Sequence, residues 1–155
     1  KSCVHGHLIL DRYVQLFETE VFITWLRCPI NRTISLYKHI LENPDPGNSL
    51  HQKVVAEQLS IIEFCELEMN WNQLFHWIGN RNPEDFKVIG FLETAQASIA
   101  KCAAALNWSC IPEFPWVNKT QNGHVIEVSS SEREFIRSKN KDELLWIQKA
   151  QKIFQ

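Results

Sequence analysis

The 155-residue chain lacks several features that would place it in a specialised class of protein. None of its hydrophobic runs approaches the roughly 18–20 residues that a membrane-spanning helix needs. Its net charge of −2 lacks the basic excess of a general nucleic-acid binder, so any anion-binding function must come from a few placed cations. Hydrophobic residues make up 45% of the chain, which is ordinary for a folded globular protein. We therefore expect a single domain over residues 1–155.

Cysteine is present without a pattern that would give it a structural role. The five cysteines are odd in number and form no C-x-x-C pair, so neither a zinc site nor a disulfide framework is indicated. The N-terminal sequence KSCVHGHLIL has no initiator Met and no signal-peptide layout, which favours a piece of a longer chain. Three N-x-S/T tripeptides, at Asn31, Asn107 and Asn118, are weak evidence for secretion. We predict a cytoplasmic protein, with the Golgi lumen as the alternative.

What is present is a mixed pattern of strands and helices. Two segments, 20–26 and 86–93, are β-branched and aromatic and are bounded by polar residues, as buried strands are. Helical spacing or capping signals predict helices over 8–17, from Pro29 to about Leu41, and over 51–68, 71–79, 94–108, 130–138 and 141–154. Loops are expected at 43–49, 80–85 and 109–128. This order predicts an α/β protein with a parallel sheet flanked by helices and a helix-rich C-terminal half.

Three helices carry more detailed signals. In the helix after Pro29, apolar side chains recur at helical intervals and define a buried face: Ile30, Ile34, Tyr37 and Leu41. Thr94 is the expected N-cap of the Ala-rich helix over 94–108. Ser129 stands three residues before Glu132, as in a capping box, and predicts the start of the next helix.

The stretch FITWLRCPINRTISLYKH, residues 22–39, places an arginine at the end of a buried strand. Ligands of open α/β sheets bind outside the carboxyl ends of the strands, and a helix N-terminus favours anions. Arg32, Ser35 and His39 share one face of the following helix. Arg27, that helix N-terminus and Ser35 could together hold a phosphate. The alternative is that Arg27 pairs with a carboxylate and Ser35 is a small packing residue.

The second candidate group is His5-Gly6-His7. In an extended segment the two imidazoles point the same way, and one of them could act as a general base. A metal is the weaker interpretation, because no Cys, Asp or Glu nearby completes a ligand set. The alternative is a pair of surface histidines without a catalytic role.

Together, HGH and the strand–helix unit LR-x-P-x-x-R-x-x-S-x-Y resemble a known family of enzymes. These sulfotransferases transfer sulfate from 3′-phosphoadenosine 5′-phosphosulfate (PAPS) to carbohydrates, and the likeness is greatest to the heparan sulfate 2-O-sulfotransferase type. The resemblance extends over most of the chain, including FKVIGFLET (86–94), but only the two motifs are specific. It implies a sheet of the P-loop NTPase type, PAPS as co-substrate, no metal, and a sugar or other small polar acceptor.

The resemblance also implies roles for particular residues. Arg27 and Ser35 match the arginine and serine that hold the 3′-phosphate of the nucleotide, and Arg32 belongs to the same motif. His7 matches the catalytic base, with His5 as its assisting neighbour. VNKT, residues 117–120, resembles a basic, hydroxyl-bearing segment that closes over the nucleotide, which adds Lys119 and Thr120 to the expected donor site.

The chain departs from the family pattern in two places. Cys28 stands where the family usually has an aspartate, and cysteine is a poor helix cap. The family's first strand and the loop that cradles the 5′-phosphosulfate find no match within residues 1–155, so we expect them to precede Lys1. With that strand missing, one edge of the sheet is expected to be exposed or filled by a partner.

Of two other functions, one remains open. The chain could be a non-catalytic nucleotide-binding or interaction domain of sulfotransferase ancestry. A P-loop kinase is not supported, because G-x-x-x-x-G-K-[ST] does not occur. The acceptor cannot be read from the sequence, since Trp71, Trp77 and Trp116 could stack on a sugar or fill a core.

Overall fold

A computed structural model describes residues 6, 8–14, 21–114 and 127–155 of the chain. In these ranges two strands and seven α-helices follow one another along the sequence. They are β1 (Phe22–Leu26), α1 (Pro29–Glu42), α2 (Ser49–Ala56), α3 (Ile61–Glu66), α4 (Gln73–Ile78), β2 (Phe86–Phe91), α5 (Ala95–Leu106), α6 (Ser130–Lys139) and α7 (Lys141–Phe154). Short 3₁₀ turns occur at η1 (Leu10–Arg12), η3 (Glu68–Asn70), η4 (Pro83–Asp85) and η5 (Leu92–Thr94).

The two strands form a parallel pair, as the sequence predicts. Leu26 of β1 lies level with Phe91 of β2, so the carboxyl ends of both strands meet at the same edge. Their β-branched and aromatic side chains suit a pleated surface. β2 is almost wholly buried, whereas β1, predicted as a buried strand, has only Leu26 fully buried and leaves Trp25 42% exposed. The protein is thus a helix-rich α/β structure whose described residues form a two-stranded parallel sheet. No helix in those ranges has the length and apolar character required to cross a membrane.

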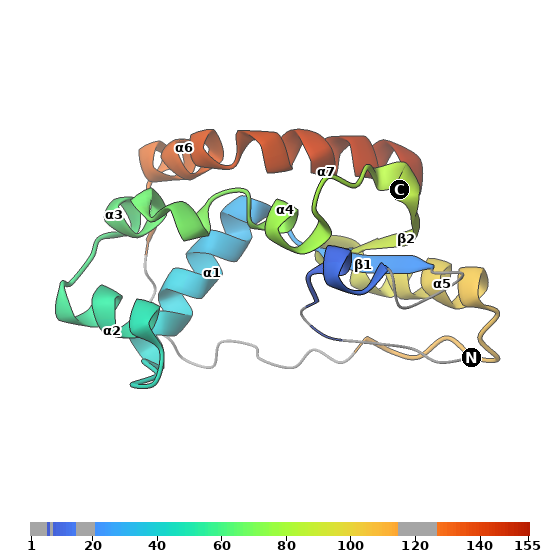
Figure 1. Ribbon diagram of the computed structural model, residues 1–155, viewed down its shortest axis with the longest axis horizontal. Helices are drawn as coiled ribbons and strands as arrows, with labels where there is room; N and C mark the ends of the chain where they lie inside the picture. Colours follow the sequence, from blue (N-terminus) through green and yellow to red (C-terminus); the bar gives the residue numbers. More distant parts are fainter. Residues whose placement is uncertain (1–5, 7, 15–20, 115–126) are drawn as a thin grey trace.

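Helices cover both faces of this sheet. Figure 1 shows α7 above the strands and α5 on the opposite side. Alternation along the strands explains the two layers, since Leu26, Ile89 and Phe91 share a cluster with residues of α4 and α7. On the α5 side Gly90 leaves room for the Trp25 ring, because a Cβ at this glycine would lie 2.6 Å from an indole carbon. We call the α7-side group the sheet cluster.

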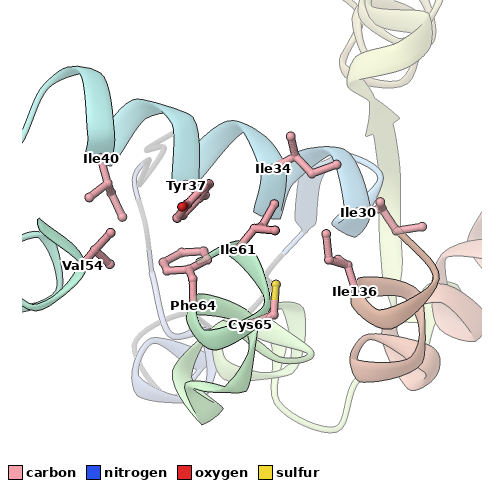
Figure 2. Close-up of a cluster of buried hydrophobic side chains, with 9 residues drawn as sticks. All are labelled: Ile30, Ile34, Tyr37, Ile40, Val54, Ile61, Phe64, Cys65 and Ile136. Carbon is pink, nitrogen blue, oxygen red and sulfur yellow. The ribbon is translucent and has the colours of Figure 1, made fainter. Parts of the chain in front are cut away.

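A second group of buried side chains lies along α1, and we call it the helical cluster (Figure 2). It joins α1 to α2, α3 and α6. Ile30, Ile34 and Tyr37 are buried as predicted. The prediction that Leu41 is buried is wrong, because its side chain is 40% exposed. The neighbouring Ile40 is 0% exposed instead and faces Val54 of α2. Ile40 and Leu41, three and four residues after Tyr37, both lie on a helical stripe that includes Tyr37. Because α2 packs against the Ile40 side, Ile40 is the one that is buried.

Two predicted helices are shorter in the structure. The prediction of a single helix over 51–68 is wrong, because this segment forms three separate elements, α2, α3 and η3. Gln58 adopts a positive φ of 52°, and Ser60 then starts α3 with a reciprocal capping box to Glu63. Of the helix expected over 8–17, the structure shows only the 3₁₀ turn η1, and residues 15–17 lie outside the described ranges.

The other boundaries follow the local signals closely. Ser129 caps α6 through a capping box with Glu132, as predicted. Gly79 ends α4 with a φ of 63°, which glycine adopts without strain. Thr94 precedes α5 as expected, but its hydroxyl makes no capping bond and lies 3.4 Å from the Ser98 hydroxyl instead. The predicted loop over 109–128 has no helix or strand in its described residues.

The neighbouring residues Ile40 and Leu41 give a direct test of how α1 packs. Replacing Ile40 with Ala should lower the free energy of unfolding by about 2–5 kcal/mol, because the cavity would lie inside the helical cluster. Leu41→Ala is the matched control and should cost less than about 1 kcal/mol. Urea unfolding of the two variants measures both values. Equal losses, or a larger loss for Leu41→Ala, would mean that α1 is rotated relative to this description.

Candidate functional site at the carboxyl edge of the sheet

Both strands lead into helices at the same edge of the sheet. Arg27 and Cys28 connect β1 to α1, and η5 connects β2 to α5. This edge of a parallel sheet is where α/β proteins commonly bind ligands, since loops from neighbouring strands converge there. The positive end of the α1 dipole points to the same place. The structure therefore places Arg27 and the start of α1 at an edge where anion binding is chemically favoured.

The structure describes three of the predicted donor-binding residues, and two of them, Arg27 and Ser35, have no partner within the described ranges. Both side chains are half-buried, and neither has a hydrogen bond or ion pair with any other described residue. Arg27 directly follows β1, and Ser35 lies in the second turn of α1. Within the same ranges, no acceptor meets the backbone N–H of Ile30 or of Asn31 at the start of α1. The described part of this edge thus offers hydrogen-bond donors without acceptors of their own.

Arg32, the third predicted contact, is already engaged. Its guanidinium forms a two-pronged ion pair with Glu143 at the start of α7, with Nη2 donating to Oε2 at 3.0 Å and Nη1 donating to Oε1. A phosphate that took the same two N–H donors would have to displace a buried carboxylate. The contact between Arg32 and a nucleotide stays a prediction. What the ion pair does in this structure is join α1 to the start of α7.

Glu93 is a charged group of this edge that the sequence reasoning missed. Its Oε1 accepts a hydrogen bond from the backbone N–H of Cys28 at 2.8 Å. Cys28 is the N-cap of α1, and its own side chain makes no capping bond. Glu93 therefore fixes the Cys28 amide from beyond β2, but it does not replace the capping aspartate that the resemblance places at position 28, because an N-cap side chain accepts from the N–H of Ile30 or Asn31. The available signal was the position of Glu93, two residues past a strand that runs parallel to β1.

Several other predicted residues do not gather at this edge or cannot be placed. His5, His7, Lys119 and Thr120 lie outside the described residues. His39 is exposed near the far end of α1, and its ring meets His51 edge-on with the centroids 6.3 Å apart.

Of the tryptophans considered for sugar stacking, Trp116 also lies outside the described residues. Trp71 donates through its indole N–H to the Cys65 carbonyl, and the Lys139 ammonium lies 4.3 Å from its ring centroid. Trp77 packs against the sheet cluster. These two contacts favour packing as the role of Trp71 and Trp77.

The buried cysteines are unsuited to nucleophilic chemistry. Burial raises the pKa of the Cys65 thiol to about 11 and also raises the pKa of Cys102, so both stay protonated near neutral pH. Within the described ranges, no three His, Cys, Asp or Glu side chains gather so that they could hold a metal ion. The chemistry of the described edge is therefore that of an arginine, a hydroxyl, backbone amides and one carboxylate.

Comparison with known proteins adds no constraint to this description. No family model, no curated protein and no solved structure matches the chain.

The bond between Glu93 and Cys28 predicts a contrast between two substitutions. Glu93→Ala removes the acceptor of the Cys28 N–H and should lower the free energy of unfolding by about 0.5–1.5 kcal/mol. Glu93→Gln keeps an oxygen at this position and should cost less than half as much. Urea unfolding distinguishes them. A Gln variant as unstable as the Ala variant would contradict this, and would show that the stabilisation comes from the charge of Glu93 and not from an acceptor oxygen at this position.

Proposed function

We propose that the chain is a PAPS-dependent sulfotransferase domain of the P-loop-like type that acts on a hydroxyl of a carbohydrate or other small polar acceptor. One observation carries the proposal. Arg27 stands without a partner among the described residues at the carboxyl end of β1, directly before α1, and Ser35 follows on that helix. This is the arrangement that the LR-x-P-x-x-R-x-x-S-x-Y motif implies for 3′-phosphate binding.

The proposed chemistry of donor binding uses groups of this edge. The planar guanidinium of Arg27 suits two-pronged contact with a phosphate, and the Ser35 hydroxyl donates a further hydrogen bond. Glu93 adds a negative charge beside the Cys28 amide, which opposes indiscriminate anion binding. Affinity for the nucleotide then depends on the arginine and the hydroxyl. Lys119 and Thr120 are proposed to close over the nucleotide.

The proposed transfer step is a direct displacement at sulfur. The acceptor oxygen forms a bond to the sulfur as the bond from sulfur to the 5′-phosphate oxygen breaks, and the hydroxyl proton passes to His7. Adenosine 3′,5′-bisphosphate leaves with the bridging electrons. Positioning by the donor site and proton removal by a neutral imidazole are the two contributions proposed for this chain.

Donor binding can be tested with adenosine 3′,5′-bisphosphate by calorimetry. Arg27→Ala should weaken binding roughly ten- to 150-fold, because a charge-assisted contact contributes about 1.5–3 kcal/mol. Ser35→Ala should weaken it less, by about two- to tenfold, because its contact is between a neutral donor and the phosphate. Arg133→Ala, which removes an exposed guanidinium on α6, is the control and should bind as the unmodified protein does. Unchanged affinity in a folded Arg27→Ala protein would remove this site assignment.

The role of His7 is tested by turnover in a preparation that transfers sulfate from PAPS. His7→Ala should lower turnover by roughly 10²–10⁴-fold, the contribution of a general base, and leave adenosine 3′,5′-bisphosphate affinity nearly unchanged. His5→Ala should have a smaller effect. The rate should also fall as the pH drops below neutrality, because a protonated imidazole cannot accept the hydroxyl proton. Wild-type turnover in His7→Ala would place the base elsewhere, and binding without turnover in the unmodified protein would favour the non-catalytic nucleotide-binding alternative.

A further inference from the structure

The ion pair between Arg32 and Glu143 is unusual in its burial. The Glu143 side chain is 1% exposed and that of Arg32 is 26% exposed. A carboxylate is rarely buried so completely unless each of its oxygens is paired, because its desolvation is costly. Here each oxygen accepts from a different nitrogen of one guanidinium, which fixes the relative orientation of the two groups as well as their distance.

Glu143 also connects the starts of three helices. Besides Arg32 in α1, its Oε2 accepts a hydrogen bond from the N–H of Leu74 in α4 at 3.3 Å. Its own N–H, in the first turn of α7, donates to the Asn72 side-chain oxygen at 3.1 Å. The N–H of Asn72 in turn donates to the side chain of the buried Asn140, again at 3.1 Å. The network therefore ties the beginnings of α1, α4 and α7 together.

The place of Arg32 in the sequence links this network to the proposed donor site. Arg32 lies five residues after Arg27 and three residues before Ser35, near the start of α1. The remaining packing of α1 in the helical cluster is mostly apolar and comes from the face that carries Ile30 and Ile34. Apolar burial is non-directional, whereas a two-pronged ion pair has a defined geometry. The ion pair is thus a directional constraint on this part of α1, in addition to the hydrogen bond from the Cys28 N–H to Glu93.

We propose that Arg32 and Glu143 are a positioning pair for donor binding. They hold the start of α1 so that Arg27 and Ser35 reach the same 3′-phosphate, and they do not contact the nucleotide themselves. Two of the five N–H donors of Arg32 are directed at Glu143, and with this pair intact we assign the phosphate contacts to Arg27 and Ser35. This inference rests on the proposed function.

The test compares Arg32→Lys with the matched control Arg133→Lys on α6. Lysine keeps the positive charge and loses the two-pronged geometry. Calorimetry measures the affinities for adenosine 3′,5′-bisphosphate and for adenosine 5′-monophosphate, and their ratio reports recognition of the 3′-phosphate. Arg32→Lys should lower this ratio at least fivefold, and Arg133→Lys should leave it unchanged. A purely structural role would lower the melting temperature without moving the ratio.

A double variant separates positioning from direct contact. If Arg32 acts through Arg27, adding Arg32→Lys to Arg27→Ala should cause little further loss of 3′-phosphate recognition. Additive losses would mean that Arg32 binds the phosphate itself and would overturn the proposal. If Arg32→Lys does not fold, Glu143→Gln takes its place, because its amide oxygen can still accept from Arg32. Loss of folding in both variants would make the pair a stability element only and would also overturn it.

The outcomes also separate this inference from the proposed function. A wild-type protein that shows no preference for adenosine 3′,5′-bisphosphate over adenosine 5′-monophosphate would contradict the donor site as a whole. A clear wild-type preference that survives intact in folded Arg32→Lys and Glu143→Gln would contradict the positioning role alone and leave the donor site standing.

Discussion

The arrangement of the helices depends on one buried interaction, the ion pair between Arg32 and Glu143 with the hydrogen bonds that complete it. The helical cluster and the sheet cluster are separate groups of apolar side chains, and elements of both meet at this network. α1 contributes mainly to the helical cluster, and α4 and α7 to the sheet cluster. Removing one partner of a buried ion pair costs about 3–5 kcal/mol, a large part of the 5–15 kcal/mol that stabilises a typical domain. Apolar burial supplies the driving force for both clusters, and the ion pair fixes how they are joined.

The same constraint bears on the proposed function, because α1 both anchors the network and follows Arg27. At the carboxyl edge of the sheet, a guanidinium and a hydroxyl have no partners among the described residues, and the Glu93 carboxylate accepts from the Cys28 amide. In the proposed site, Glu93 opposes negative charge that Arg27 does not meet directly, so binding would depend on the contacts of Arg27 and Ser35. A chain with a net charge of −2 can in this way bind a multiply charged nucleotide without a broadly basic surface.

The sequence predicted the features that depend on local chemistry. The strands at 20–26 and 86–93, the start of α1 at Pro29 and the Ser129 capping box all follow from residues close together in the chain. Features set by distant partners could not be read in this way. Glu93 lies 65 residues from Cys28, and Glu143 lies 111 residues from Arg32, so no spacing rule connects them. The burial of Ile40 in place of Leu41 likewise depends on where α2 docks, since helical periodicity allows both.

The central claim is that a nucleotide 3′-phosphate binds at the carboxyl end of β1. A crystal structure of the protein with adenosine 3′,5′-bisphosphate tests it most directly. The account predicts the 3′-phosphate within about 2.7–3.2 Å of both the Arg27 guanidinium and the Ser35 hydroxyl, with Arg32 still paired to Glu143. A nucleotide bound away from this edge of the sheet, or an Arg32 that has left Glu143 for the phosphate, would contradict it.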